Sequence, residues 1–568
     1  RDYYASRGLG DVYKRQAKNY GGAIFNAGTI KFNGSAVFTG NKAAHGGAAA
    51  NKSNLTLVKG ATFKKNYASV NGGALNNGGT FVSDGDLRFE ENESGLNGGA
   101  VYNTSSGNFS VNGNATFIKN KSQDGSALIN FGTVTFGKTA LFKENFSETS
   151  VSDGTVWNKG IINFNGLAEF IDNTAYVTSG AIYNDVNGNV NFNAGATFTN
   201  NTAGTSGGAV YNKGRLNFNA GATFTNNKSA GNGGAIYNDG TISFSDAEYV
   251  FENNTMSGKL FDIYNLGTLN IGGTQATVFK AASILGSGMT NITGTGTVDF
   301  FASSGSVLTW ENYINIASGA TLTVNDNFLS TVIKKDGFGD VILNKGTLNF
   351  KGATNEFKTA GTGSELNNIR NDSVMNIGVA GNTTAFNVSR IAGTGTTNIL
   401  GNVNLNAANA EKTIDWQNHI VVDSGVTLTV TGTSNFHDVN HSGSGGAFYN
   451  EGTVVLNGDV VFENNKTSLY GAAIRNEKPA SVFTINGFAT FKKNTAADGN
   501  AAISNRGTMT LNGGGLFEGN ETKQNGGVAI ANSGSLTLDV PAGSNVKYTF
   551  KNNISAGIGG AINNINGG

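Results

Sequence analysis

The side chains with the clearest potential for binding chemistry are six aromatic residues spaced by one or two repeats of about 26 residues. They are Tyr102, Trp157, Tyr183, Tyr211, Tyr237 and Tyr264. Each follows an aliphatic residue in a short strand-like phrase, so the alternation of side chains along a strand places it on the outer face. Such rings could stack on sugar rings or contact a protein. They could also pack on one another as a ladder that shields the sheet, which is the simpler interpretation.

Residues that could perform catalysis or hold a metal are few. His437 and His441 have the i, i+4 spacing of a helical metal pair, but the Asn, Ser and Gly residues around them indicate a loop. The nearest acidic candidates for hydrolase or lyase chemistry are Asp84, Asp86 and the run Lys334-Lys335-Asp336, which are more simply solvated turns. We therefore predict a non-enzyme with no catalytic residue, no metal and no cofactor.

The composition indicates short strands joined by tight turns. The 568 residues include 83 glycines, 37 phenylalanines and only two prolines, and 38% of residues are hydrophobic. Because 39 basic residues balance 39 acidic ones, no general attraction to nucleic acid or to an anionic membrane is expected. The chain has no cysteine, which excludes disulfides and thiolate metal sites. No apolar run reaches the roughly 18 residues of a membrane helix.

Two phrases recur in phase along most of the chain. The first is Gly-Gly-Ala-aliphatic-x-Asn, as in residues 233–238, and the second is Phe-x-x-Asn, as in residues 251–254. The last Asn of the first phrase recurs at Asn26, Asn51, Asn77, Asn103, Asn130, Asn158, Asn184, Asn212, Asn238 and Asn265, and again at Asn450, Asn476, Asn505, Asn532 and Asn564. A fixed period of this length is the signature of stacked repeats.

Each period contains three strand candidates, which in one copy are residues 209–212, 215–219 and 222–226. Turn residues separate them, and no helical periodicity lies between them. We predict an all-β parallel β-helix of about 26 residues per three-strand coil. In the copy at 233–238, Ile236 points inward and Tyr237 outward. One coil buries too little apolar surface to offset the entropy of ordering it, so only the stacked array folds.

The recurring asparagines are predicted to form a structural ladder. Asn tolerates the left-handed conformation, and its amide can cap backbone groups in a turn. Amides at the same corner of successive coils could also bond to one another and fix the register of the coils. The predicted ladder comprises Asn103, Asn130, Asn158, Asn184, Asn212, Asn238 and Asn265.

Four segments are expected from the pattern. The first, residues 1–16, does not fit the repeat and could be a non-native segment or an irregular linker. Both phrases occur in residues 17–265 and 441–568. The segment between them, residues 266–440, is expected to form divergent coils of the same helix. The divergent segment contains its own duplication, because residues 310–314 (WENYI) match residues 416–420 (WQNHI) 106 positions later. We expect the sequence to be cut at both ends.

The two phased phrases resemble the repeats of the chlamydial-type polymorphic outer-membrane proteins, which are autotransporter adhesins. The fuller copies of Gly-Gly-Ala-[Ile/Leu/Val] are residues 21–24, 72–75, 98–101, 207–210, 233–236 and 559–562, accompanied by thirteen Phe-x-x-Asn sites. The resemblance covers residues 17–265 and 441–568. It implies a right-handed parallel β-helix passenger at the bacterial cell surface, anchored through a C-terminal β-barrel outside this sequence.

The resemblance also implies binding to host cells, so the expected partner is a host-cell surface protein or glycan. The chain departs from the family pattern in lacking a signal peptide, the cysteines that members often carry and the barrel. Two alternatives remain open: a polysaccharide-degrading β-helix enzyme of the pectin-lyase type, and a stalk that binds nothing. An exposed acid essential for glycan turnover would favour the first alternative.

Overall fold

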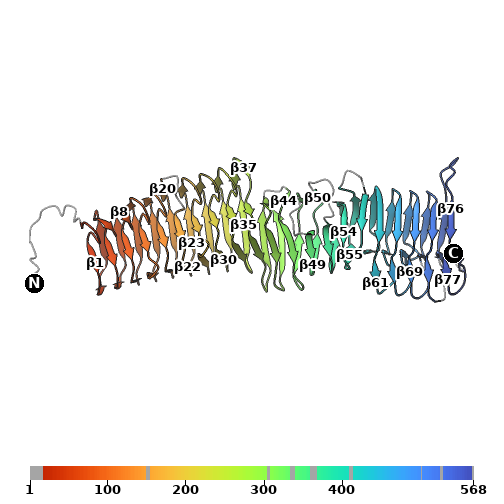
Figure 1. Ribbon diagram of the computed structural model, residues 1–568, viewed down its shortest axis with the longest axis horizontal. Coiled ribbons are helices and arrows are strands. Elements are labelled where there is room, and N and C mark those ends of the chain that lie inside the picture. Colours follow the sequence, from red (N-terminus) through yellow and green to blue (C-terminus); the bar gives the residue numbers. More distant parts are fainter. Residues whose placement is uncertain are drawn as a thin grey trace, which may run out of the picture. The chain divides into compact units, whose positions relative to one another are not determined.

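The computed structural model describes residues 17–148, 154–303, 307–332, 339–358, 367–408, 413–500, 502–524, 527 and 529–565. The chain forms two compact units, residues 1–270 and 271–568. Within the described ranges, all the regular elements are β-strands (Figure 1). No helix in those ranges has the length and apolar character needed to span a membrane. The predicted segment 1–16 lies outside the described residues.

One coil of the first unit shows how the repeat folds. It consists of β29 (Val210–Asn212), β30 (Arg215–Phe218), β31 (Ala222–Thr225) and β32 (Lys228–Ser229). Each strand pairs in parallel with its counterpart one coil later, namely β33 (Ile236–Asn238), β34 (Thr241–Phe244), β35 (Glu248–Glu252) and β36 (Thr255–Met256). The chain therefore winds as stacked coils of roughly 26 residues, which confirms the predicted parallel β-helix.

The coils that carry the repeated phrases add a fourth short strand to the three that were predicted. In the first unit these strands form a ten-stranded sheet from β4 (Lys42–His45) to β37 (Lys259–Leu260). All its pairings are parallel except the last, in which β36 and β37 run antiparallel. Most of these strands span only two residues, too few to show an alternation in the sequence. The sheet leads directly into the Gly-Gly-Ala phrase and so supports one side of the candidate site.

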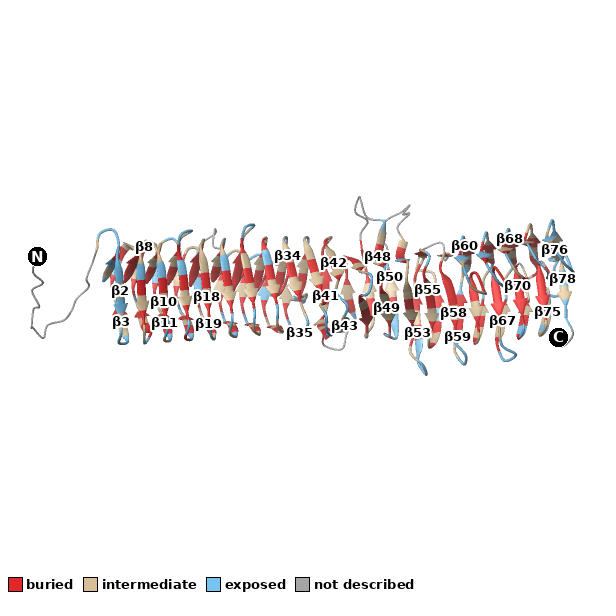
Figure 2. Ribbon diagram, turned by 90° about the horizontal axis from the view of Figure 1, so that it is seen from below, coloured by how far each residue is buried: buried red, intermediate tan, exposed pale blue. Residues whose placement is uncertain are grey.

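The core of the first unit is built from columns of identical side chains. Phe224 stacks between Phe198 and Phe251, with ring centroids 4.6 and 4.7 Å away and planes within 1° of parallel. The ring of Phe218 meets Phe224 edge-on at 5.9 Å. Buried and less buried residues alternate along the strands (Figure 2), and burial of each Phe contributes roughly 1.5–3 kcal/mol. The predicted inward residue Ile236 is buried, which confirms the alternation of this strand.

The two glycines of the repeated phrase serve different geometric needs. Gly233 adopts the left-handed conformation, with φ of 73°, which favours glycine. A Cβ atom on Gly234 would lie 2.1 Å from the carbonyl oxygen of Phe261 on the next coil. The phrase therefore lets two coils approach closely at this corner.

The second unit contains both divergent and regular coils. The duplicated tryptophans, Trp310 on β44 (Leu308–Trp310) and Trp416 on β57 (Thr413–Trp416), are both buried. Two residues after each, Asn312 and Asn418 donate to the carbonyl oxygens of Gly286 (2.6 Å) and Gly393 (2.7 Å). The regular repeats return in β62 (Phe448–Asn450), β66 (Ile474–Asn476), β70 (Ile503–Asn505), β74 (Ile530–Asn532) and β78 (Ile562–Asn564), which pair in parallel.

Candidate binding groove

The candidate site is the outer surface of the strands that follow Gly-Gly-Ala. Each of these strands has three residues, and only the middle one points outward; in β29, Val210 and Asn212 are fully buried and Tyr211 lies between them half-buried. The loop that carries the two glycines borders the middle residue on one side. The residue directly after the ladder asparagine borders it on the other. We call this surface the outer groove of each unit, with the middle residues as its floor and the residues after the asparagines as its wall. Each unit has its own groove, because the strands after Gly-Gly-Ala belong to one sheet in the first unit and to another sheet in the second.

Four of the six predicted stripe residues form one continuous stack on the floor. Tyr183 and Tyr211 have ring centroids 5.2 Å apart, Tyr211 and Tyr237 4.5 Å, and Tyr237 and Tyr264 5.7 Å, with planes tilted by 13–17°. Tyr183 is only 9% exposed, whereas the other three are half-buried. The rings thus pack on one another and leave part of the stack open to solvent.

The other two stripe residues, Tyr102 and Trp157, meet a residue that the sequence did not single out. Phe131 lies 5.6 Å from the ring of Tyr102 and 5.5 Å from that of Trp157. It directly follows the ladder residue Asn130 and so belongs to the wall, while Ile129 takes the floor position. Its place after a ladder asparagine is the sequence signal that could have found it.

Lysines and aspartates alternate along the wall beside the tyrosine stack. Lys159 and Asp185 form an ion pair of 3.0 Å, and the ammonium of Lys213 lies 5.5 Å from the ring centroid of Tyr211 and 5.9 Å from that of Tyr183. Such cation–ring contacts are attractive. Burial raises the pKa values of Tyr211 and Tyr237 above the ordinary value of 10.0, so both phenols stay neutral at physiological pH and can donate hydrogen bonds.

The groove opens where the floor residue is small. In the first unit, Ala50 and Asn76 lie on the floor of a cavity of about 260 Å³, which Tyr20, His45 and Tyr102 also line. The ammonium of Lys52 on the wall lies 4.7 Å from the ring centroid of Tyr20. Aromatic floor residues thus fill the groove in some coils, and small ones leave space in others.

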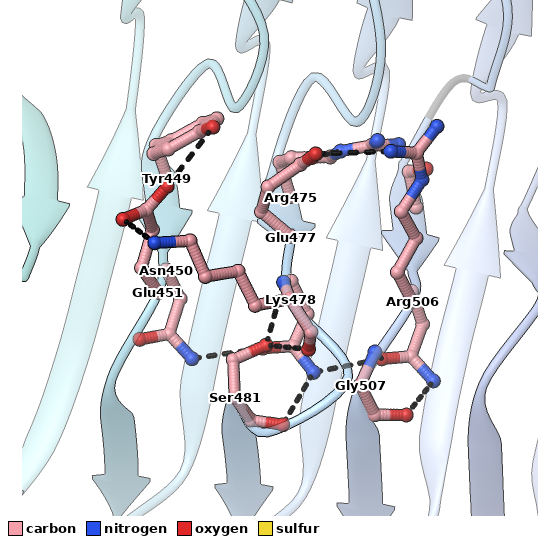
Figure 3. A network of polar contacts seen from close by, with 12 residues as sticks. Tyr449, Asn450, Glu451, Arg475, Glu477, Lys478, Ser481, Arg506 and Gly507 are labelled. Atoms are coloured by element: carbon pink, nitrogen blue, oxygen red, sulfur yellow. Dashed lines mark hydrogen bonds and ion pairs between the residues drawn. The ribbon is translucent and has the colours of Figure 1, made fainter. Parts of the chain in front are cut away.

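In the second unit the wall is a network of charged side chains (Figure 3). Lys478 pairs with Glu451 at 2.7 Å. Glu477 accepts hydrogen bonds from the floor residue Arg475 and, at 3.0 Å, from the wall residue Arg506. These contacts link three successive coils and fix the guanidinium groups at the groove.

The predicted ladder asparagines lie in one column beneath the groove. From each one, Nδ2 donates to Oδ1 of the next over 2.7–2.9 Å, and all seven are fully buried. The column comprises Asn103, Asn130, Asn158, Asn184, Asn212, Asn238 and Asn265. Because their amides are occupied by one another and by backbone carbonyl groups, these residues position the floor and the wall of the groove.

The Phe-x-x-Asn asparagines form a second buried ladder. Asn201 donates through both its backbone N–H and its Nδ2 to Oδ1 of Asn227, each over 3.0 Å, and Asn227 Nδ2 donates to the carbonyl of Phe198 at 2.9 Å. The left-handed residue of this turn is Asn226, with φ of 56°. The sequence suggested that a ladder asparagine would adopt the left-handed conformation. In this second ladder Asn226 adopts it, and the ladder residue Asn227 follows directly after.

The acidic and histidine candidates are held in separate contacts. Asp84 accepts from Asn112 at 2.9 Å, and Asp86 accepts the backbone N–H of Asn114 at 2.8 Å, so both belong to exposed turn contacts. The rings of His441 and His419 stack at 3.8 Å. The run at 334–336 lies outside the described residues. Among the residues that are described, no group of three or more His, Asp or Glu side chains is placed to hold a metal.

His437 has partners that sequence reasoning missed. Its ring contacts the carboxylate of Asp415 through Nε2 and that of Asp438, at 2.7 Å, through Nδ1. Asp415 also pairs with Arg390 at 3.2 Å. Asp415 lies 22 residues before His437 in coils without the repeated phrases, so only the stacking of coils brings the two together.

Stacked coils joined by buried asparagine ladders place this protein in the class of parallel β-helix solenoids. The family model described as the Chlamydia polymorphic membrane protein repeat matches residues 195–213 and 221–239. Each matched segment runs from a Phe-x-x-Asn phrase to the ladder asparagine of the next coil, so this part of the chain carries repeats of that family, as the resemblance indicated. No curated protein and no solved structure matches the chain.

Proposed function

We propose that this chain is the surface-exposed passenger region of a bacterial autotransporter-like adhesin, and that the outer groove attaches it to a host-cell surface protein or glycan. The repeat family supports the location at the outer surface of the bacterium. The observation that carries the binding role is the partly open tyrosine stack of Tyr183, Tyr211, Tyr237 and Tyr264. Aromatic rings held rigid at a polar surface are the usual anchors of interfaces.

A non-enzymatic role is part of the proposal. Glycan cleavage commonly uses two carboxyl groups facing each other across the substrate bond. Asp84 and Asp86, the described pair that the sequence offered, accept hydrogen bonds from neighbouring asparagines in exposed turns. Depolymerisation of pectin-like glycans by the purified protein, lost on substitution of an exposed acid, would replace this proposal with the enzymatic alternative.

Binding to intact cells tests the proposal against the stalk alternative. Labelled purified protein is titrated onto cultured epithelial cells, with competition by unlabelled protein. An adhesin binds saturably and is displaced by the competitor. A stalk shows only linear, non-displaceable association, and that result would overturn the adhesive role.

A further inference from the structure

An opening of the outer groove in the second unit has a distinct chemistry. It is a cavity of about 440 Å³, within the size range of small-ligand sites. Its floor includes Arg475, Ser504 and Ala531, and Tyr470 and Arg506 border it. Ser504 and Ala531 occupy the position that tyrosines fill in the stacked coils of the first unit, so the space exists because these two side chains are small.

Positive charge dominates the cavity. Arg475 and Arg506 are the only charged side chains among the residues that line it. Glu477 stands behind them and accepts hydrogen bonds from both guanidinium groups. One carboxylate facing two guanidinium groups leaves one positive charge at the groove, which favours an anionic ligand.

Arg475 is held in a fixed orientation. Its side chain is only 5% exposed, its Nη1 donates to Oγ of Ser504, and its guanidinium carbon lies 5.2 Å from the ring centroid of Tyr470. Ser504 Oγ also accepts from Asn500 at 3.2 Å. Arg506, in contrast, is 54% exposed, so a ligand can reach its guanidinium group. The site therefore combines a buried cation with an exposed one.

We infer that this cavity binds the carboxylated ring of an acidic sugar, a ligand that deepens and rests on the proposed adhesive function. The Arg506 guanidinium pairs with the carboxylate, Tyr470, which is 37% exposed, packs against the ring, and Asn500 and Ser504 supply hydrogen-bonding groups for hydroxyls. A peptide is disfavoured, because β66, β70 and β74 already pair with one another and offer no free strand edge at the floor.

The inference is tested by calorimetric titration of the full chain with four probes. Methyl glucuronide and methyl sialoside carry a carboxylate on different kinds of sugar, and methyl glucoside and N-acetylmannosamine are neutral counterparts. Saturable binding of either acidic probe, at least tenfold tighter than its neutral counterpart, is expected. Whichever of the two acidic probes binds identifies the kind of acidic sugar that the cavity accepts. Equal binding of acidic and neutral probes, or no saturable binding of any, overturns the inference.

Three variants assign the binding to this cavity. Arg506→Gln removes the exposed charge, and Ala531→Tyr fills the cavity with the side chain found on the floor in five coils of the first unit; each is expected to weaken acidic-sugar binding at least tenfold. Arg215→Gln, at an exposed position on β30, is the charge-matched control and should bind as the wild type does. Because Ala531→Tyr could disturb folding, Arg506→Gln decides the outcome, and wild-type affinity in that variant overturns the inference.

The cell titration separates this inference from the proposed function. Cell binding without acidic-sugar binding would leave the adhesive role standing and overturn the inference. Acidic-sugar binding without cell attachment would uphold the cavity and overturn the adhesive role.

Discussion

Asn212 donates from Nδ2 to Oδ1 of Asn238 over 2.8 Å, and both residues are fully buried. The same nitrogen also reaches the carbonyl oxygens of Gly214 and Thr241, each at 3.2 Å. One amide thus connects its own turn with the neighbouring coil. Since Tyr211 and Lys213 stand on either side of Asn212 in the chain, this contact sets the register of the groove floor and wall.

Asn212→Ala is expected to destabilise the first unit by about 1–3 kcal/mol, because Asn184 and Asn238 each lose a buried hydrogen bond and the column between them is interrupted. Urea unfolding and hydrogen exchange of β29 measure the loss. Asn219→Ala is the control, since the Asn219–Asn193 bond of 2.8 Å is exposed and its loss should cost about 0.5 kcal/mol or less. Equal losses in the two variants would contradict a structural role for the buried ladder.

Gly234→Ala is expected to cost about 1–3 kcal/mol, because the added methyl group would overlap the carbonyl of Phe261 and force the coils apart. Gly28→Ala is matched to it, since nothing lies within 4 Å of a Cβ atom added there. Thermal unfolding of both variants tests the close approach. If the Gly234→Ala protein were as stable as the Gly28→Ala protein, the two coils would not be in close contact at this corner.

Acid is expected to destabilise the coil at the start of β58 (His419–Val422), where His419 is buried. Burial, and secondarily the neighbouring His441, lowers the pKa of His419 from 6.5 to about 4. A histidine held neutral by the fold contributes stability that is fully present above pH 6.5 and is lost as the pH falls toward about 4. Urea midpoints of the wild type should fall over this range, and His419→Gln should flatten the dependence. An unchanged slope in the variant would assign the acid sensitivity elsewhere.

His437 is expected to show the opposite dependence. The hydrogen bond to Asp415, and then the one to Asp438, raises the pKa of His437 to about 9. Its contribution to stability is therefore full below pH 6.5 and is lost as the pH rises through about 9. The NMR titration of the ring measures this directly, and Asp415→Asn should move the midpoint downward. A wild-type midpoint at the ordinary value would show that the ion pairs do not persist in solution.

Much of the scaffold could be predicted from the sequence, because a pattern that is ambiguous in one coil becomes clear when it recurs in many coils. Ile236 and Tyr237 could be assigned to opposite faces since the same alternation recurs in coil after coil. The short strand Lys228–Ser229 could not be found, because two residues carry no alternation. Strand propensity alone does not reveal a pairing that depends on the next coil.

The site was less predictable than the scaffold. The outward tyrosines could be named from spacing, yet their partial burial depends on the loop and wall beside them. Phe131 and Lys213 follow ladder asparagines in the sequence, but only the structure shows that this position lies beside the rings of the floor. The cavity at Arg475 arises because the floor residues Ser504 and Ala531 are small, where other coils have large side chains.

If the tyrosine stack is the adhesive surface, the double variant Tyr211→Ala/Tyr237→Ala should lose cell binding. Alanine already stands on the floor at Ala50 and Ala531, so the variant is expected to keep the fold, which its circular dichroism spectrum checks. Tyr176→Ala, at a side chain that is 62% exposed, is the control. Cell binding is expected to be at least tenfold weaker for the double variant and unchanged for the control. Undiminished binding by a folded double variant would show that the tyrosine stack is not the adhesive surface.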